Sequence, residues 1–99
     1  MVRHIVMWNQ PENGNPAEQR ENAIQVKEGL EALKNSIPGI IDLKVYIDAL
    51  PTGNRRVVLN SLFESPEALA SYQVHPDHLR VSAFVGSLLC DRACIDYYE

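Results

Sequence analysis

The order in which the hydrophobic pattern changes its period constrains the fold of this chain most strongly. A helical spacing of apolar residues occupies residues 17–37, and a second helical region, interrupted by a proline, occupies residues 65–90. The alternation typical of β-strands occurs in four other segments, residues 2–8, 40–49, 56–63 and 92–98. The resulting order, β-α-β-β-α-β, predicts an α+β fold of the ferredoxin-like type, with an antiparallel sheet that carries both helical units on one face.

The length and composition of the chain favour one domain over residues 1–99. The chain has 99 residues, of which 45% are hydrophobic. A chain of this size buries roughly two-thirds of its unfolded surface, so its stability is modest and dimerisation would increase it. No internal repeat or linker divides the sequence.

The face of the sheet that the helices leave open is expected to be apolar. It would carry residues such as Ile5 and Met7, or else a row of alternate residues in the second strand, Ile41, Leu43, Val45 and Ile47. An apolar sheet face is unfavourable in water, and a second copy of the chain is the simplest cover for it. The sequence therefore predicts a homodimer.

Charge and composition argue against several classes of function. The net charge is -4 and no basic cluster occurs, which disfavours nucleic acids and anionic membranes as partners. No segment approaches the ~20 apolar residues that span a bilayer, and no signal peptide is recognisable. Cys90 and Cys94 form no CxxC pair, so we expect buried thiols in a reducing, cytoplasmic compartment. No phosphate-binding loop, nucleophile elbow or redox motif is present, so we expect no cofactor.

The interrupted helical region is the most informative stretch for function. Ser65 is a suitable N-cap for its first half. Pro76 disfavours helical geometry at His75 and can itself open a second helix. Tyr72 and His78 would then flank the break, which makes this a candidate site. The expected core residues of the second helix are Leu79, Phe84, Val85 and Leu88.

Several segments together resemble the stress-responsive A/B barrel family, also called Dabb domains. These are Val-Arg-His-Ile-Val at residues 2–6, Phe-Glu-Ser at 63–65, Tyr-Gln-Val-His-Pro-Asp-His at 72–78 and Asp-Tyr at 96–97. The Tyr-x-x-His-Pro-x-His spacing is the most specific of them. The resemblance covers nearly the whole chain and implies a dimeric α+β barrel, in which two sheets pack face to face with the helices outside.

The resemblance also implies candidate chemistry. The family includes a plant cyclase that forms olivetolic acid, and cyclase-type members use the Tyr and the second His of the motif as a catalytic pair. These correspond to Tyr72 and His78, and His4 would enter the same cavity, which we expect Trp8 to line. An imidazole with a pKa near ~6.5 can remove a proton α to a carbonyl, while a phenol hydroxyl stabilises the enolate oxygen. A helix N-terminus would keep His78 neutral.

This chain departs from the cyclase pattern at two positions. The cyclase has a further His on the third strand, where Val57 stands here. The basic residue that usually ends the first strand is here Asn9. The motif that supplies the Tyr and the second His is complete.

Other functions compete with cofactor-free chemistry on a small hydrophobic or carbonyl-bearing, polyketide-like ligand. Family members linked to stress lack a firm activity, so the motif can also be structural, in a protein that assembles or sequesters a ligand. The wider superfamily contains cofactor-free monooxygenases and small-substrate isomerases. Metal binding is disfavoured, because the spacing of its candidate ligands fits no standard zinc pattern: His4, His75, Asp77 and His78.

Overall fold

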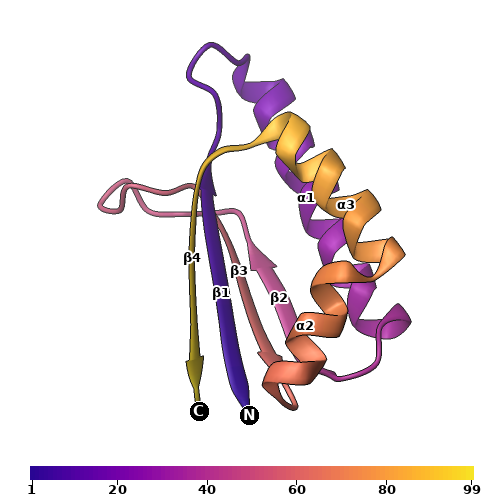
Figure 1. Cartoon of the computed structure of the whole chain (residues 1–99). Helices are drawn as coiled ribbons and strands as arrows, with labels where there is room; N and C mark the ends of the chain where they lie inside the picture. Colours follow the sequence, from indigo (N-terminus) through magenta and orange to yellow (C-terminus); the bar gives the residue numbers. More distant parts are fainter.

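The computed structural model describes residues 1–99, and Figure 1 shows its elements. The second helical region is divided into two helices, as the sequence predicted. The order of its helices and strands and the arrangement of its sheet are those of the ferredoxin-like α+β fold. In chain order the elements are β1 (Val2–Asn9), α1 (Pro16–Ser36), β2 (Ile40–Tyr46), β3 (Val57–Phe63), α2 (Pro66–Val74), α3 (Pro76–Leu88) and β4 (Cys90–Tyr98).

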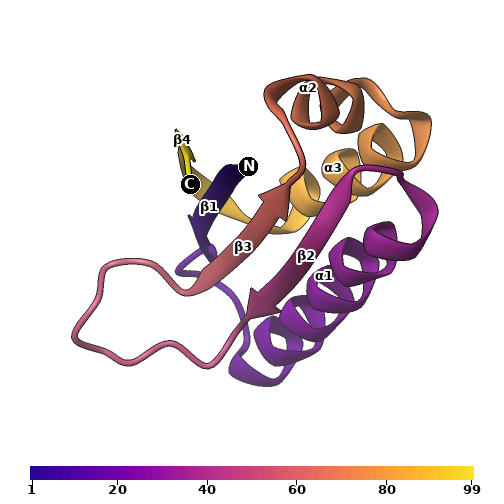
Figure 2. The same ribbon diagram turned by 90° about the horizontal axis from the view of Figure 1, so that it is seen from below.

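The four strands form one antiparallel sheet in the order β2-β3-β1-β4. The three helices cover the same face of this sheet, and the other face is left without helices (Figures 1 and 2). β1 is a central strand that pairs with β3 on one side and with β4 on the other. The first and last strands of the chain are therefore neighbours, and the two termini lie side by side (Figure 1).

Alternate residues of β1 point toward the helices, which follows from the two-residue repeat of a strand. These are Val2, His4, Val6 and Trp8, and all four are buried. The apolar residues among them join one core cluster with the buried stripe of α1. That stripe was predicted from the helical spacing and consists of Ala23, Val26, Leu30 and Leu33.

The first two helices begin at side-chain caps. The Asn15 carboxamide oxygen accepts a hydrogen bond from the Ala17 N–H at 2.8 Å at the start of α1. The Ser65 hydroxyl accepts one from the Ala68 N–H at 3.1 Å at the start of α2. A proline follows each cap at the first helical position, where its missing N–H leaves no hydrogen bond unmade.

His75 both ends α2 and caps α3. Its backbone is extended, as expected for a residue before proline, and its N–H donates to the Tyr72 carbonyl oxygen at 3.2 Å. Its Nδ1 atom accepts a hydrogen bond from the Asp77 N–H at 3.1 Å. The break predicted at Pro76 is confirmed, and the His75 side chain orders it.

The open face of the sheet is largely apolar. It carries Ile5 and Met7 of β1, which alternate with the buried residues of that strand. Strand pairing places Val58 and Leu62 of β3 and Ile95 of β4 on the same face. The expectation that Ile5 and Met7 lie on the open face is confirmed.

The alternative prediction, that the row of alternate residues from Ile41 to Ile47 lies on the open face, was wrong. Leu43 and Val45 are buried in the core under the helices. The β2–β3 register shifts between Ile40 and Asp42, so Ile41 falls in the irregularity and leaves the face of Leu43. As a result Ile41 is exposed, and no continuous apolar row of β2 reaches the open face.

The predicted core of the last helix was also partly wrong. Val85 is buried and Leu88 packs against the core, but the Leu79 and Phe84 side chains are 54% and 39% exposed. Val81, Val85 and Leu88 follow the spacing of three and four residues that keeps one helix face inward. Leu79 and Phe84 lie outside that narrow stripe.

The two cysteines are free, but Cys94 is exposed and Cys90 is only partly buried, so the predicted burial of both thiols was wrong. The reason is that Cys94 lies on β4, an edge strand. Element boundaries also differ slightly from the sequence prediction, because β2 ends at Tyr46 rather than near residue 49. No helix combines the length and the apolar character needed to cross a membrane.

We expect Gly39→Ala to lower the free energy of unfolding by at least ~1 kcal/mol, because Gly39 has φ +91°, a left-handed conformation that is costly for alanine. A Cβ atom there would also lie 2.8 Å from the Ala68 Cβ atom. Urea unfolding measures the change. Gly29→Ala in α1 is the matched control, because its Cβ meets only Val81 at 3.6 Å, and it should stabilise by roughly 0.5–1 kcal/mol. Equal stability of the two variants would mean that the backbone conformation of Gly39 carries no constraint.

Candidate functional site

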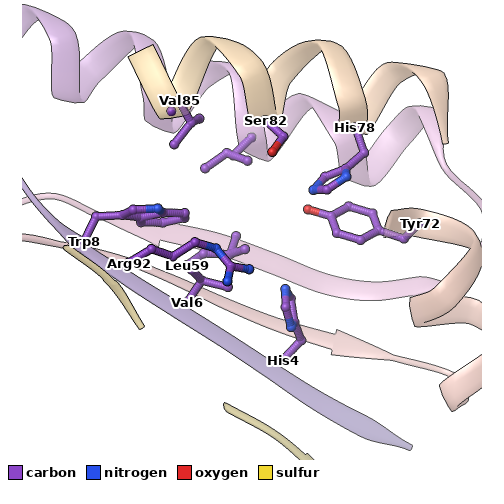
Figure 3. A pocket seen from close by; sticks show the side chains of 11 residues that line it. His4, Val6, Trp8, Leu59, Tyr72, His78, Ser82, Val85 and Arg92 are labelled. Carbon is purple, nitrogen blue, oxygen red and sulfur yellow. The ribbon is translucent and has the colours of Figure 1, made fainter. Parts of the chain in front are cut away.

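A pocket of about 140 Å³ lies between the helix-bearing face of the sheet and the helices. Cavities of about this size hold one benzene-sized molecule. Figure 3 shows its side chains converging from β1, α2, α3 and β4. The lining residues are His4, Val6, Trp8, Leu30, Leu59, Tyr72, His78, Ser82, Val85, Gly86 and Arg92. All four residues predicted to line a cavity, His4, Trp8, Tyr72 and His78, therefore border the same pocket.

Tyr72 lies in the last turn of α2 and is only 1% exposed. Its ring packs against Phe63, with ring centroids 4.9 Å apart, and against His78, with centroids 4.2 Å apart. The hydroxyl oxygen is buried and has no hydrogen-bond partner in the chain. Burial raises the pKa of the hydroxyl well above its usual value, so Tyr72 stays protonated and can donate a hydrogen bond into the pocket.

His78 occupies the first turn of α3, and its ring projects beside the Tyr72 hydroxyl (Figure 3). Its Nδ1 atom lies 3.2 Å from the Gln73 carbonyl oxygen. This contact is a hydrogen bond when Nδ1 carries the proton, which leaves the lone pair on Nε2. Burial lowers the pKa of the His78 imidazole, and the nearby Arg92 guanidinium lowers it further. His78 is therefore neutral at neutral pH and can accept a proton.

His4 enters the pocket from β1 and is 2% exposed. Its Nδ1 atom pairs with a carboxylate oxygen of Asp96, the residue opposite it on β4. Its ring meets the edges of Phe63 and Tyr72, at centroid distances of 6.0 and 6.3 Å. The carboxylate thus orients the imidazole and leaves its second nitrogen free to contact a ligand.

Sequence reasoning missed four residues of this region. Ser82 and Gly86 follow His78 at intervals of four residues, so the helical repeat itself could have placed them on one face of α3. Asp96 was noted only as part of a family motif. Arg92 could have been placed by strand alternation, because it shares the face of Asp96, but the pairing of β4 with β1 is needed to show that this face meets His4.

The four candidate metal ligands of the sequence, His4, His75, Asp77 and His78, do not form one cluster. His75 and Asp77 are in contact at the helix break, with Nδ1 and Oδ2 3.9 Å apart. The candidate ligand atoms that do lie within 4.8 Å of one another belong to His4, Cys94 and Asp96. In this cluster the His4 nitrogen is already paired with the Asp96 carboxylate.

The sequence profile of the stress responsive A/B barrel domain family, Dabb, matches residues 2–99. The chain belongs to the Dabb family. The family predicted from the motif at residues 72–78 is therefore confirmed. A comparison with curated protein sequences finds no match.

Solved structures similar to this Dabb chain share its fold along nearly its whole length. A dimeric protein of unknown function from Bacteroides fragilis is 26% identical, with a TM-score of 0.91, and the match covers 99% of this chain and 95% of that one. A dimeric ferredoxin-like protein of unknown function from Thermobifida fusca is 24% identical, with a TM-score of 0.79 and coverages of 99% and 90%. The hydroxynitrile lyase of Passiflora edulis is 19% identical, with a TM-score of 0.74 and coverages of 97% and 90%.

The Dabb motif of this chain separates into two roles in the structure. Tyr72 and His78 face the pocket, while His75 holds the helix break. Val57, which stands where the cyclase has a further histidine, is buried in the core and is not among the pocket residues. The other polar groups of this pocket come from β1, β4 and the next turn of α3, which carries Ser82.

We expect the His78 imidazole of the folded chain to have a pKa below its ordinary value of ~6.5, because burial disfavours the charged form. At pH values between the lower pKa of His78 in the folded chain and its ordinary pKa in the unfolded chain, His78 is neutral when folded and protonated when unfolded. Histidine NMR spectra recorded against pH measure the midpoint, and the chain in urea gives the reference. Arg92→Gln should raise the folded midpoint, because it removes a nearby positive charge. A folded midpoint at or above the reference in urea would contradict the assignment.

Proposed function

We propose that this pocket binds a small hydrophobic or carbonyl-bearing molecule and that Tyr72 and His78 perform acid/base chemistry on it without a cofactor. The observation that carries the proposal is the Tyr72 hydroxyl, which is buried and unpaired within the chain. Buried polar groups are normally hydrogen-bonded, and the exceptions require an explanation. A ligand oxygen that accepts this hydrogen bond is the explanation we favour.

The two side chains suit the removal of a proton next to a carbonyl group. The His78 Nε2 atom takes the proton from the α carbon, and the electron pair of the broken C–H bond moves onto the carbonyl oxygen. The Tyr72 hydroxyl donates a hydrogen bond to that oxygen and stabilises the enolate. In a polyketide-like substrate the enolate carbon then attacks a second carbonyl carbon, and the new alkoxide takes the proton back from His78.

The surroundings of the pair support this chemistry. Apolar side chains such as Val6, Leu59 and Val85 line more than half of the pocket, so a hydrogen bond to a developing negative charge is strong there. His4, oriented by Asp96, offers a second polar contact on the opposite wall. The fold also accommodates catalysis in another protein, since the Passiflora edulis protein with the same fold is named as a hydroxynitrile lyase.

We expect Tyr72→Phe and His78→Asn each to lower the turnover of a polyketide-like diketo thioester by at least ~100-fold, the usual contribution of a positioned acid or base. Asn at position 78 can still donate to the Gln73 carbonyl oxygen, so it removes the base and keeps the local hydrogen bond. Product formation followed by mass spectrometry is the measurement. Tyr46→Phe, an exposed tyrosine outside this pocket, is the control and should leave the rate unchanged.

The same assay separates chemistry from simple binding. If the wild-type chain binds the thioester without turnover, the ligand-sequestering alternative replaces the enzymatic one. If it neither binds nor converts any carbonyl compound of this class, the proposal fails. Cytoplasmic location stays a prediction from the sequence.

We also propose that the open sheet face is covered by a second copy of this chain. The apolar face that includes Ile5, Met7 and Ile95 supports this, and structures of the same fold are described as dimeric. Two such faces packed together give the two-sheet barrel expected from the sequence.

We expect light scattering to return the mass of a dimer at micromolar concentration. Ile5→Lys should shift the mass toward a monomer, because a charged group in an apolar interface is strongly disfavoured. Leu79→Lys, the same kind of change on an exposed helix surface, is the control and should leave the dimer intact. A monomeric wild-type chain would contradict the proposal.

A further inference from the structure

Arg92 borders the pocket as a solvent-exposed residue whose guanidinium group has no ion-pair partner in the chain. It lies near the start of β4 and borders the same pocket as Tyr72 and His78. Figure 3 shows its guanidinium group reaching past the Trp8 ring toward the region between His4 and Tyr72. Arg92 takes part in none of the ion pairs of the chain.

The two-residue repeat of β4 places Arg92 on the helix-bearing face, because it lies two residues before Cys94, the partner of Val6, and an irregularity follows directly beside it. Met7 pairs with Ala93 and Asn9 pairs with Cys90, so β4 has one residue more than β1 over this interval. Such a β-bulge leaves one residue unpaired and bends the strand locally. It includes Asp91, the only residue other than glycine with a positive φ, at 54°. Left-handed backbone is costly outside glycine, and such conformations cluster at functional sites.

Neighbouring side chains hold this bulge in place. The Arg55 Nε atom donates a hydrogen bond to the Asp91 carbonyl oxygen at 2.9 Å. The Asn9 side chain donates to the Asp91 carboxylate at 3.3 Å. The Asp91 carboxylate is therefore engaged with β1 outside the pocket and is not paired with Arg92.

No carboxylate lines the pocket, and the one that pairs with a lining residue is already engaged. Asp96 pairs with the His4 imidazole. The remaining polar groups of the lining are the Tyr72 and Ser82 hydroxyls, the Trp8 indole N–H, the His78 imidazole and the Arg92 guanidinium. None of them carries a negative charge, so an anionic group of the ligand would be the counter-ion of Arg92.

We propose that the Arg92 guanidinium binds a carboxylate of the ligand, so that the pocket selects small carbonyl-bearing or aromatic carboxylic acids. This inference rests on the proposed function and names its substrate class. The planar guanidinium matches a planar carboxylate through two parallel hydrogen bonds. A phosphate is a poorer fit, because phosphate sites gather several donors, often at a helix N-terminus. The carboxylate lies at the Arg92 end, and the reacting carbonyl group lies against Tyr72 and His78.

The helix opposite Arg92 leaves room for this group. Ser82 and Gly86 are the α3 residues that face the pocket beyond His78, and both are small. A Cβ atom added at Gly86 would meet no other atom within 4 Å. A ring of benzene size with one carboxylate therefore fits a pocket of about 140 Å³ with its charged end toward this gap.

Benzoate and benzamide test the inference, because they share size and shape and differ in charge. NMR titration of the wild-type chain should give benzoate an affinity at least about tenfold higher than that of benzamide, as expected for a charge-assisted hydrogen-bonded pair. Arg92→Gln should abolish the preference, and Arg92→Lys should keep part of it. Arg80→Gln removes an equal charge from outside the pocket and should leave the preference unchanged.

Three outcomes would overturn the inference. The two probes could bind equally, benzoate could fail to bind at millimolar concentration, or the preference for benzoate could survive in Arg92→Gln. Spectra of each variant establish that it is folded, and Arg92→Lys retains the charge if the Gln variant does not fold. The result is separable from the test of the acid/base proposal. If the chain converts neutral thioesters but shows no preference for benzoate, only the proposed role of Arg92 is contradicted. If it prefers benzoate but converts no substrate, only the acid/base proposal is contradicted.

Discussion

The pocket depends on a backbone constraint at Pro76. Proline lacks an N–H and disfavours helical geometry in the residue before it, so α2 ends at Val74 and α3 begins with a new direction. On an uninterrupted helix, side chains six positions apart would point about 120° away from each other. The break instead brings the rings of Tyr72 and His78 to a centroid distance of 4.2 Å. The proline thereby converts two residues of one sequence motif into two adjacent groups of one site.

The sheet supplies the other half of the site and gives it a different electrostatic character. β1 is a central strand, so His4 is buried, and its imidazole pairs with the Asp96 carboxylate on the neighbouring strand. β4 is an edge strand, and Arg92 lies on the same face as Asp96, at the border of the pocket. The result is a mostly apolar recess in which a hydrogen-bond donor and a neutral imidazole lie side by side under the helices and a cation lies at the β4 border.

Local patterns explain which features could be predicted from the sequence. Two-residue alternation placed His4 and Trp8 on the same face of β1, and the Ser65 cap and Pro76 placed the broken helix. Features that depend on strand pairing could not be obtained in this way. Asp96 contacts His4 across 92 positions of sequence, and the β4 bulge between Cys90 and Ala93 is visible only in the β1–β4 register. Ile41 was misplaced for the same reason, because a register shift on β2 moved it out of its row.

The adjacency of β1 and β4 has a consequence for how the domain matures. β1 leaves the ribosome before every other strand of the sheet and β4 after them, yet the two pair from Val2 with Tyr98 to Asn9 with Cys90. A long-range pairing of this kind closes late. The pairing of His4 with Asp96 can therefore form only after the rest of the domain has been synthesised. A chain truncated before residue 90 keeps the Tyr72–His78 segment but lacks β4, which carries Arg92 and Asp96. The pocket therefore reaches its complete lining only after β4 has been synthesised and has paired with β1.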